Sequence, residues 1–175
     1  NGKNMNNKRF CIGNWKMSLD NNESIDFVKK FNSFHFNNDC NIVICPSFTS
    51  ISDVIKYNIN DYFSVGGQDV SIYDNGSYTG QISLNMLESL GCKYAIIGHS
   101  ERREFCNEND VTVNKKLHRI NNSSLIPIIC IGETLEQREK DEHLVVIKNQ
   151  LTTIFNEQVI NNDKDIIVAY EPVWA

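Results

Sequence analysis

The sequence has 175 residues, of which 41% are hydrophobic and 22% charged, a balance typical of one soluble globular domain. The net charge is −5 and the basic residues are dispersed, so we expect no nucleic-acid partner, because such partners are bound by clustered positive charge. No apolar run approaches the roughly 20 residues that span a bilayer, so we expect no membrane segment.

The N-terminus and the cysteines bear on the compartment. Residues 1–8 form a polar N-terminal extension that lacks the apolar stretch of a secretion signal. The six cysteines include no C-x-x-C pair and no zinc-finger spacing, and several lie in apolar runs, as small buried side chains do. We therefore expect reduced thiols, a cytoplasmic protein and no bound metal.

The first half of the chain alternates short apolar runs with amphipathic stretches. Runs that stop at a glycine or before a proline predict strands at 9–13, 41–45 and 62–66. Apolar residues at helical spacing predict helices at about 20–34 and 50–57. The polar stretch 67–81 holds three glycines and no apolar period, so it predicts a long loop, of a kind that is often functional.

The second half repeats the alternation. It predicts helices at 83–90, 110–120 and 137–156, and strands at 94–97, 125–131 and 165–170. Gly91 stands where a left-handed residue commonly ends a helix. Pro127 lacks a backbone donor, which a strand tolerates near its start. Apolar strands that alternate with helices predict one α/β domain with a parallel sheet covered on both faces.

The carboxyl ends of parallel strands are where such sheets carry their chemistry. The sequence has no nucleophile elbow, no G-x-G-x-x-G and no P-loop. A lysine, a histidine and a carboxylate instead suit proton abstraction next to a carbonyl, with the carboxylate as base. A single polar residue after a strand is more often a surface or turn residue than a functional one. Several such residues on one rim of the sheet, however, favour a functional site. The candidates after the predicted strands are Asn14, Lys16, Gln68, Asp69, His99, Ser100, Glu101, Glu133 and Glu171.

Six motifs between residues 9 and 175 resemble the triosephosphate isomerase family, in order and spacing. They are GNWKM at 13–17, GGQD at 66–69, YTGQIS at 78–83, GHSERR at 98–103, CIGE at 130–133 and AYEPVWA at 169–175. The resemblance implies a (β/α)8 TIM barrel that interconverts dihydroxyacetone phosphate and glyceraldehyde 3-phosphate through an enediolate, in glycolysis and gluconeogenesis. It implies neither a cofactor nor a metal.

The resemblance also implies which residues act on the substrate. Glu171 would be the base that moves a proton between two substrate carbons. His99 would be a neutral electrophile, because in this family the N-terminus of a helix keeps the histidine uncharged. Lys16 would bring positive charge to the enediolate and the phosphate, and Asn14 would contact substrate beside it.

Further roles follow from the same resemblance. Glu101 would hold Lys16 in place. Glu133 would meet Trp174 when a lid closes over the site, and Cys130 would lie behind the groups that touch substrate.

The loop 67–81 resembles the arm that inserts into a partner subunit in this family. Gln68 and Thr79 lie in this loop, and Thr79 would reach the partner's site. The resemblance therefore implies a homodimer in which neither site is complete alone.

A complete barrel of this kind has eight strands and about 250 residues. The sequence predicts only the first six βα units, so we expect a single partial barrel over residues 1–175, not closed, with free edges at the first and sixth strands. One interpretation is that the natural chain continues past Ala175 and that the 175-residue polypeptide alone is inactive. Another is a non-catalytic remnant that acts only as an interaction protein. A further alternative is another barrel isomerase of phosphorylated sugars.

Overall fold

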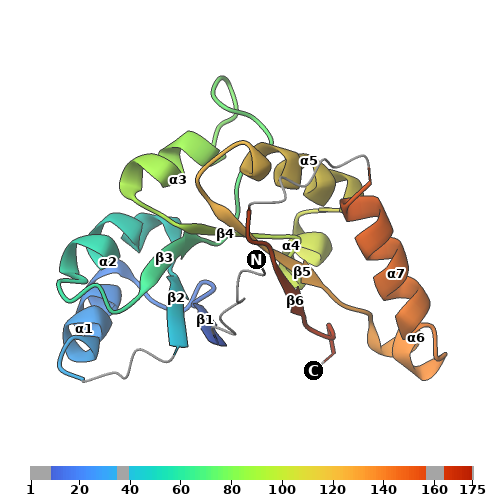
Figure 1. Ribbon diagram of the computed structural model, residues 1–175, viewed down its shortest axis with the longest axis horizontal. Helices are drawn as coiled ribbons and strands as arrows, with labels where there is room; N and C mark the ends of the chain where they lie inside the picture. The colour runs from blue at the N-terminus through green and yellow to red at the C-terminus, as the bar shows by residue number, and fades with distance from the viewer. Residues whose placement is uncertain (1–8, 35–39, 157–163, 175) are drawn as a thin grey trace, which may run out of the picture.

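The computed structural model describes residues 9–34, 40–156 and 164–174, and it shows six parallel strands in one sheet (Figure 1). The strands follow chain order across the sheet, so β1 and β6 are its edges in the described part of the chain. The predicted parallel α/β fold is confirmed, as an open half of a barrel. The predicted extension 1–8 and Ala175 lie outside the described residues. The strands are β1 (Arg9–Asn14), β2 (Cys40–Cys45), β3 (Ser64–Gly67), β4 (Tyr94–Ile97), β5 (Ile126–Ile131) and β6 (Ile167–Tyr170).

Helices surround the convex side of the sheet, and several begin at residues that cap them well. Asp20 and Glu23 form a capping box at α1, and Ser83 caps α3. Gly91 ends α3 with φ 94°, the left-handed conformation expected there. The helices are α1 (Asn21–Phe31), the short 3₁₀ helix η1 (Phe48–Ser50), α2 (Ile51–Tyr57), α3 (Leu84–Leu90), α4 (Ser100–Phe105), α5 (Asp110–Asn121), α6 (Leu135–Glu139) and α7 (His143–Ile154).

Two helical predictions differ from the structure. The stretch 137–156, predicted as one helix, contains the end of α6 and all of α7, because Asp141 takes a left-handed φ of 58° between them. Thr134 caps α6 through a capping box with Gln137. The residue pattern did not predict α4, because its six residues bury no side chain and carry no apolar period; only the resemblance implied a helix N-terminus beside His99.

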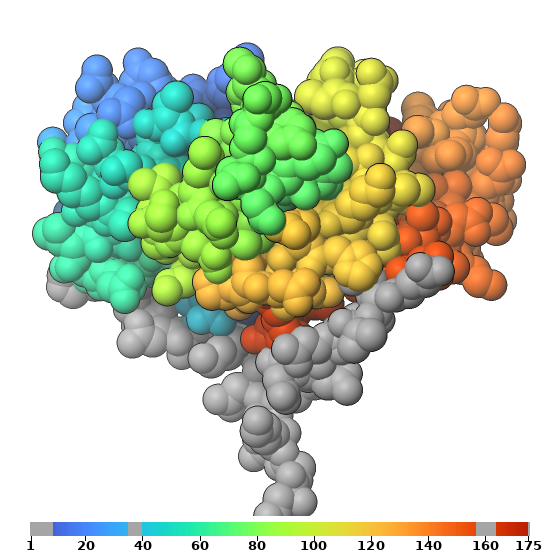
Figure 2. Space-filling view, turned by 90° about the horizontal axis from the view of Figure 1, so that it is seen from above, coloured from blue at the N-terminus to red at the C-terminus, as the bar shows by residue number. Residues whose placement is uncertain are grey.

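The strands separate two apolar layers, as alternating side chains must. Outward-facing residues such as Ile97 and Ile129 pack against the helices in the larger cluster. Figure 2 shows the helices side by side over this outer face, with the 68–83 segment (green) between them. The concave face carries a smaller cluster, whose buried members are Val43, Cys45, Tyr94, Ile96, Ile128 and Cys130.

The outer face of β6, an edge strand, is only partly covered. Val168 and Tyr170 point outward and are 45% and 51% exposed. Pro127 is the second residue of β5, near the strand start as expected. Among the described residues, no helix combines the length and apolarity needed to cross a membrane.

Candidate active site

Four charged or polar side chains from three strand ends meet at the carboxyl edge of the sheet. Lys16 Nζ lies 2.8 Å from Glu101 Oε1. The His99 ring lies between two carboxylates, with Nδ1 3.6 Å from Glu101 Oε2 and Nε2 3.8 Å from Glu171 Oε2. Residues that are up to 155 positions apart in the sequence therefore form one constellation, because parallel strands end at the same edge.

His99 is buried and is the N-cap of α4. Its Nδ1 accepts the backbone N–H of Glu101 at 3.2 Å. Because Nδ1 accepts this hydrogen bond, Nε2 is the ring nitrogen left to donate one. The N–H therefore points toward Glu171, where a carbonyl oxygen of a substrate would accept it.

Lys16 sits on a backbone that few non-glycine residues adopt, with φ 52°. Its N–H donates to Asn14 Oδ1 at 3.0 Å, and its carbonyl accepts from Gln68 Nε2 at 2.7 Å. The hydrogen bond from Lys16 lowers the pKa of Glu101, and the same bond raises the pKa of Lys16. The site thus holds a fixed positive charge on a strained turn, which is common at functional sites.

These groups border a cavity of about 190 Å³. That volume is below the roughly 300 Å³ at which pockets for drug-sized ligands begin, and it suits a molecule of a few carbon atoms. Glu171 stands at the edge of the site with its side chain 53% exposed. The cavity is lined by Asn14, Lys16, Met17, Phe48, Gln68, Asp69, His99, Glu101 and Arg102.

Gln68 and Thr79, the two residues predicted for an intersubunit loop, lie in different places. Gln68 belongs to the wall of this chain's own cavity, where it holds Lys16. Thr79 is exposed on the loop between β3 and α3, which projects from the convex side (Figure 1).

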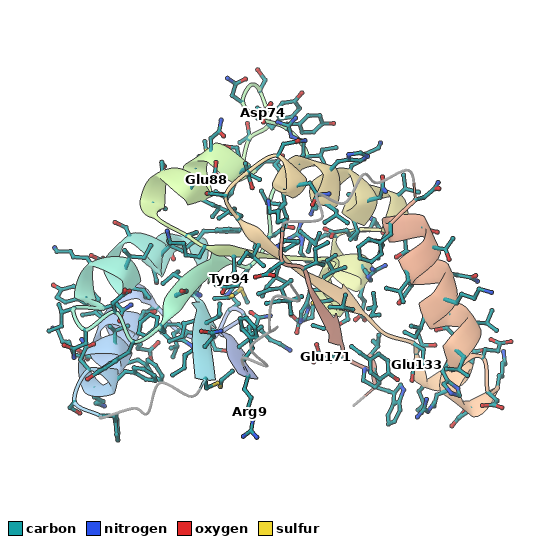
Figure 3. The ribbon with its side chains drawn as sticks, viewed as in Figure 1. Arg9, Asp74, Glu88, Tyr94, Glu133 and Glu171 are labelled. Atoms are coloured by element: carbon teal, nitrogen blue, oxygen red, sulfur yellow. The ribbon has the colours of Figure 1, made fainter. Side chains whose placement is uncertain are left out.

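Glu133 lies just beyond the end of β5 and near Glu171 (Figure 3), and its side chain interacts with that of Trp174. The fully buried Glu133 carboxylate accepts the Tyr170 hydroxyl at 3.0 and 3.2 Å and a hydrogen bond from the Trp174 side chain. The Trp174 ring lies over the Arg138 guanidinium, 5.9 Å from centroid to Cζ. Tyr170 and Arg138 were not predicted, since neither falls in a polar cluster after a strand.

Cys130 is buried in the concave cluster, and burial raises the pKa of its thiol to about 12. The thiol is therefore protonated and unreactive at neutral pH. Its carbonyl accepts Arg103 Nη2 at 3.3 Å, while Arg103 Nε donates to the Gly98 carbonyl at 2.7 Å. Arg103 thus ties the end of β4 to the end of β5.

Four charged side chains form a cluster next to the turn that leads into His99, and three of them are buried while Arg102 is 31% exposed. Lys116 Nζ is 2.5 Å from Asp69 Oδ1 and 2.6 Å from Glu108 Oε2. Arg102 binds the other oxygen of Asp69 at 2.9 Å and Glu108 at 3.1 Å. Glu108 also accepts the Gly98 N–H at 2.9 Å, which fixes the turn into His99.

The two carboxylates of this cluster differ in ionisation, because burial raises the pKa of Asp69 despite its hydrogen bond from Lys116, whereas hydrogen bonds prevail at Glu108. Burial favours the protonated form of Glu108, but the bonds from Lys116, Arg102 and Gly98 outweigh it and hold the pKa of Glu108 below its usual value. Only Asp69 of the four was a sequence candidate. Among the described residues, no group of three potential ligands is arranged to hold a metal ion.

Replacing Lys116 with methionine should destabilise the chain, because two buried carboxylates lose the buried one of the two cations that they share. We expect the free energy of unfolding to fall by about 3–5 kcal/mol. Urea denaturation of the 175-residue polypeptide measures the change. The exposed neighbour Lys115 supplies the control, since Lys115→Met should alter stability by less than about 0.5 kcal/mol. Equal losses in the two variants would contradict the assigned role.

Comparison with known proteins gives one consistent family. The model of the triosephosphate isomerase family matches residues 9–175. A triosephosphate isomerase of Alkaliphilus metalliredigens is 41% identical over 168 residues, which are 96% of this chain and 68% of the relative. One from Moorella thermoacetica is 42% identical over 163 residues, 93% of this chain and 66% of the relative. One from Clostridium botulinum strain Loch Maree is 40% identical over 163 residues, which are again 93% of this chain and 66% of the relative. The chain thus spans about two thirds of the length of these relatives.

Proposed function

Because this chain belongs to the triosephosphate isomerase family, we propose that it carries the proton-transfer groups of an enzyme that interconverts dihydroxyacetone phosphate and glyceraldehyde 3-phosphate. The observation that carries the proposal is the placement of His99 between Lys16–Glu101 and Glu171. Their separations of 2.8 to 3.8 Å put a cation, an imidazole donor and a free carboxylate around one small space.

In the proposed reaction, Glu171 takes a proton from the hydroxyl-bearing carbon next to the substrate carbonyl. The electrons of that C–H bond form the carbon–carbon double bond of an enediolate, and the carbonyl oxygen becomes negative. The His99 Nε2–H and the Lys16 ammonium stabilise that oxygen. The Glu171 carboxyl then returns the proton to the adjacent carbon, while a proton moves between the two oxygens. The substrate is rearranged without net oxidation, so the step needs no redox cofactor.

The projecting loop supports a further part of the proposal, a homodimer in the cytoplasm. Tyr73 and Tyr78 stack on this loop with ring centroids 3.8 Å apart, yet they remain 44% and 41% exposed. Exposed aromatic residues with a preset geometry are typical of contact surfaces. Thr79 lies next to them and would reach the partner's site. The six free cysteines suit a reducing compartment.

One observation favours the alternative of a chain that only binds a partner. The edges β1 and β6 are free in the described part of the sheet, and Val168 and Tyr170 are half-exposed beside the second edge. The unpaired backbone groups of an edge strand can form hydrogen bonds with a strand of another chain. Such binding would not need the arrangement around His99, so we retain the isomerase as the main proposal.

A turnover assay on two polypeptides tests the proposed function. The first is the 175-residue polypeptide. The second, called the extended chain below, is the same sequence followed by the segment that comes after the matched region in the Alkaliphilus metalliredigens relative. We expect the extended chain to convert glyceraldehyde 3-phosphate more than about tenfold faster, because Glu171 is half-exposed and closing a site excludes water from such a group.

Both outcomes of this assay are informative. A folded, dimeric extended chain without isomerase activity would refute the proposed function. Near-normal turnover by the 175-residue polypeptide would show that the six described strands with their helices suffice for the reaction.

A further inference from the structure

Gly132 lies one residue beyond the end of β5, and a single side chain binds both of its backbone polar groups. Gln150 Oε1 accepts the Gly132 N–H at 3.0 Å, and Gln150 Nε2 donates to the Gly132 carbonyl at 3.0 Å. Gln150 belongs to α7, which packs against β5. Its amide thus fixes the peptide at the point where the ladder between β5 and β6 ends.

The backbone of Glu171 also passes close to this glycine. A Cβ atom on Gly132 would lie 1.9 Å from the Glu171 carbonyl oxygen and 2.8 Å from its carbonyl carbon. Both separations are far below van der Waals contact. Gly132 does not have a positive φ, so the structure needs a glycine here for space.

Hydrogen bonds on both sides of this contact fasten the two segments together. The Glu171 N–H donates to the Ile131 carbonyl at 2.9 Å, and the Val173 N–H donates to the Glu133 carbonyl at 2.9 Å. The segment that carries Glu171 therefore follows the path of residues 131–133. Whatever fixes Gly132 also fixes the backbone from which the Glu171 side chain extends.

The Glu171 carboxylate has little else to hold it. Its side chain is 53% exposed, and among the described residues its one charged-group contact within 4 Å is with His99 Nε2, at 3.8 Å. At that distance the pair is not a hydrogen bond. The position of this carboxylate must therefore come from its backbone.

We propose that Gln150 is a positioning residue for the proposed isomerase reaction: its amide clamps Gly132 and thereby places Glu171 opposite His99. This inference rests on the proposed function. A displacement of about 1 Å between reacting groups can lower a rate about 100-fold. Loss of the clamp should therefore act on the chemical step, and it should leave substrate binding largely intact because Gln150 does not line the cavity.

Kinetics of the extended chain test the proposal. We expect Gln150→Met, which keeps the length of the side chain, to lower kcat roughly 10- to 100-fold while KM changes less than about twofold. Gln150→Glu keeps an acceptor for the Gly132 N–H but loses the donor, so it should lower kcat in the same way. Asn149→Met is the matched control, since Asn149 is an exposed amide residue of the same helix, and its kcat should stay within about twofold of the unsubstituted chain.

A second measurement does not depend on activity. In the 175-residue polypeptide, Gln150→Met should speed hydrogen exchange of the Gly132 and Glu171 amides more than about tenfold, and Asn149→Met should not. If the unsubstituted extended chain is inactive, the proposed function fails, and this exchange experiment alone decides whether the clamp exists.

Three results would overturn the inference. One is a kcat for both Gln150 variants within twofold of the unsubstituted chain. Another is an equal loss of activity in Asn149→Met. The third is unchanged amide exchange at both Gly132 and Glu171 in Gln150→Met. If Gln150→Met fails to fold, Gln150→Glu is judged by the same criteria.

Discussion

Replacing Glu171 with glutamine in the extended chain is expected to lower kcat by roughly 10³- to 10⁴-fold, the upper part of the range for a general base. The amide keeps the shape of the side chain but cannot accept the substrate proton. KM should change little, because Glu171 is half-exposed at the edge of the site and does not line the cavity. A coupled assay with glyceraldehyde 3-phosphate measures both constants.

A graded variant and a control make the experiment on Glu171 specific. Glu171→Asp retains the carboxylate but withdraws it by one methylene, so its kcat should fall between those of the unsubstituted chain and Glu171→Gln. Glu139→Gln changes another exposed glutamate, on α6, and should leave kcat unaltered. An unchanged rate in Glu171→Gln would remove Glu171 from its role as the base.

The placement of the candidate site could be predicted from the sequence because it depends on topology. Apolar runs that end in polar residues locate the strand ends, and a parallel sheet brings all of these ends to one edge. Lys16, His99 and Glu171 are therefore neighbours despite their separation along the chain. Strand boundaries were within about two residues of those observed for the same reason, since the apolar pattern itself defines the buried part of each strand.

The groups that support the site were not predictable in this way. Lys116 lies within the apolar face of α5, beside Val113 and Leu117, and its partner Asp69 is 47 residues away. Gln150 reads as an ordinary polar residue of an amphipathic helix. Its role depends on the position of α7 over the end of β5, which local periodicity does not encode.

The short helix α4 shows a related limit of sequence reasoning. Its six residues bury no side chain, so no hydrophobic period marks it. What orders this turn is the acceptance of the Glu101 N–H by His99 Nδ1, together with the bond from the Gly98 N–H to Glu108. The first bond is local, a cap between residues two positions apart, but the second reaches a buried carboxylate ten positions away. His99 and Glu101 were identified as candidates, and a helix N-terminus beside His99 was implied only by the resemblance, not by the residue pattern.

Removing the positive charge at Lys16 is expected to have the second-largest effect. In the extended chain, Lys16→Met should lower kcat/KM by roughly 10²- to 10³-fold, because an oxygen that becomes negative in the transition state loses its cation. Glu101→Gln should cost less, about tenfold, since it keeps the Lys16 charge and removes only the 2.8 Å partner that orients it. Lys148→Met on α7 is the control, as Lys148 is an exposed lysine that does not line the cavity.

Stability measurements separate this catalytic effect from damage to the fold. The Lys16 and Glu101 side chains are 47% and 44% exposed, so their ion pair contributes little to folding, about 0–1 kcal/mol. Lys16 also has a φ of 52°, which glycine adopts without strain. Lys16→Gly should therefore lose activity as Lys16→Met does, while its free energy of unfolding does not fall by more than about 1 kcal/mol. Parallel losses of activity and stability in Lys16→Gly would instead identify Lys16 as a structural residue of this turn.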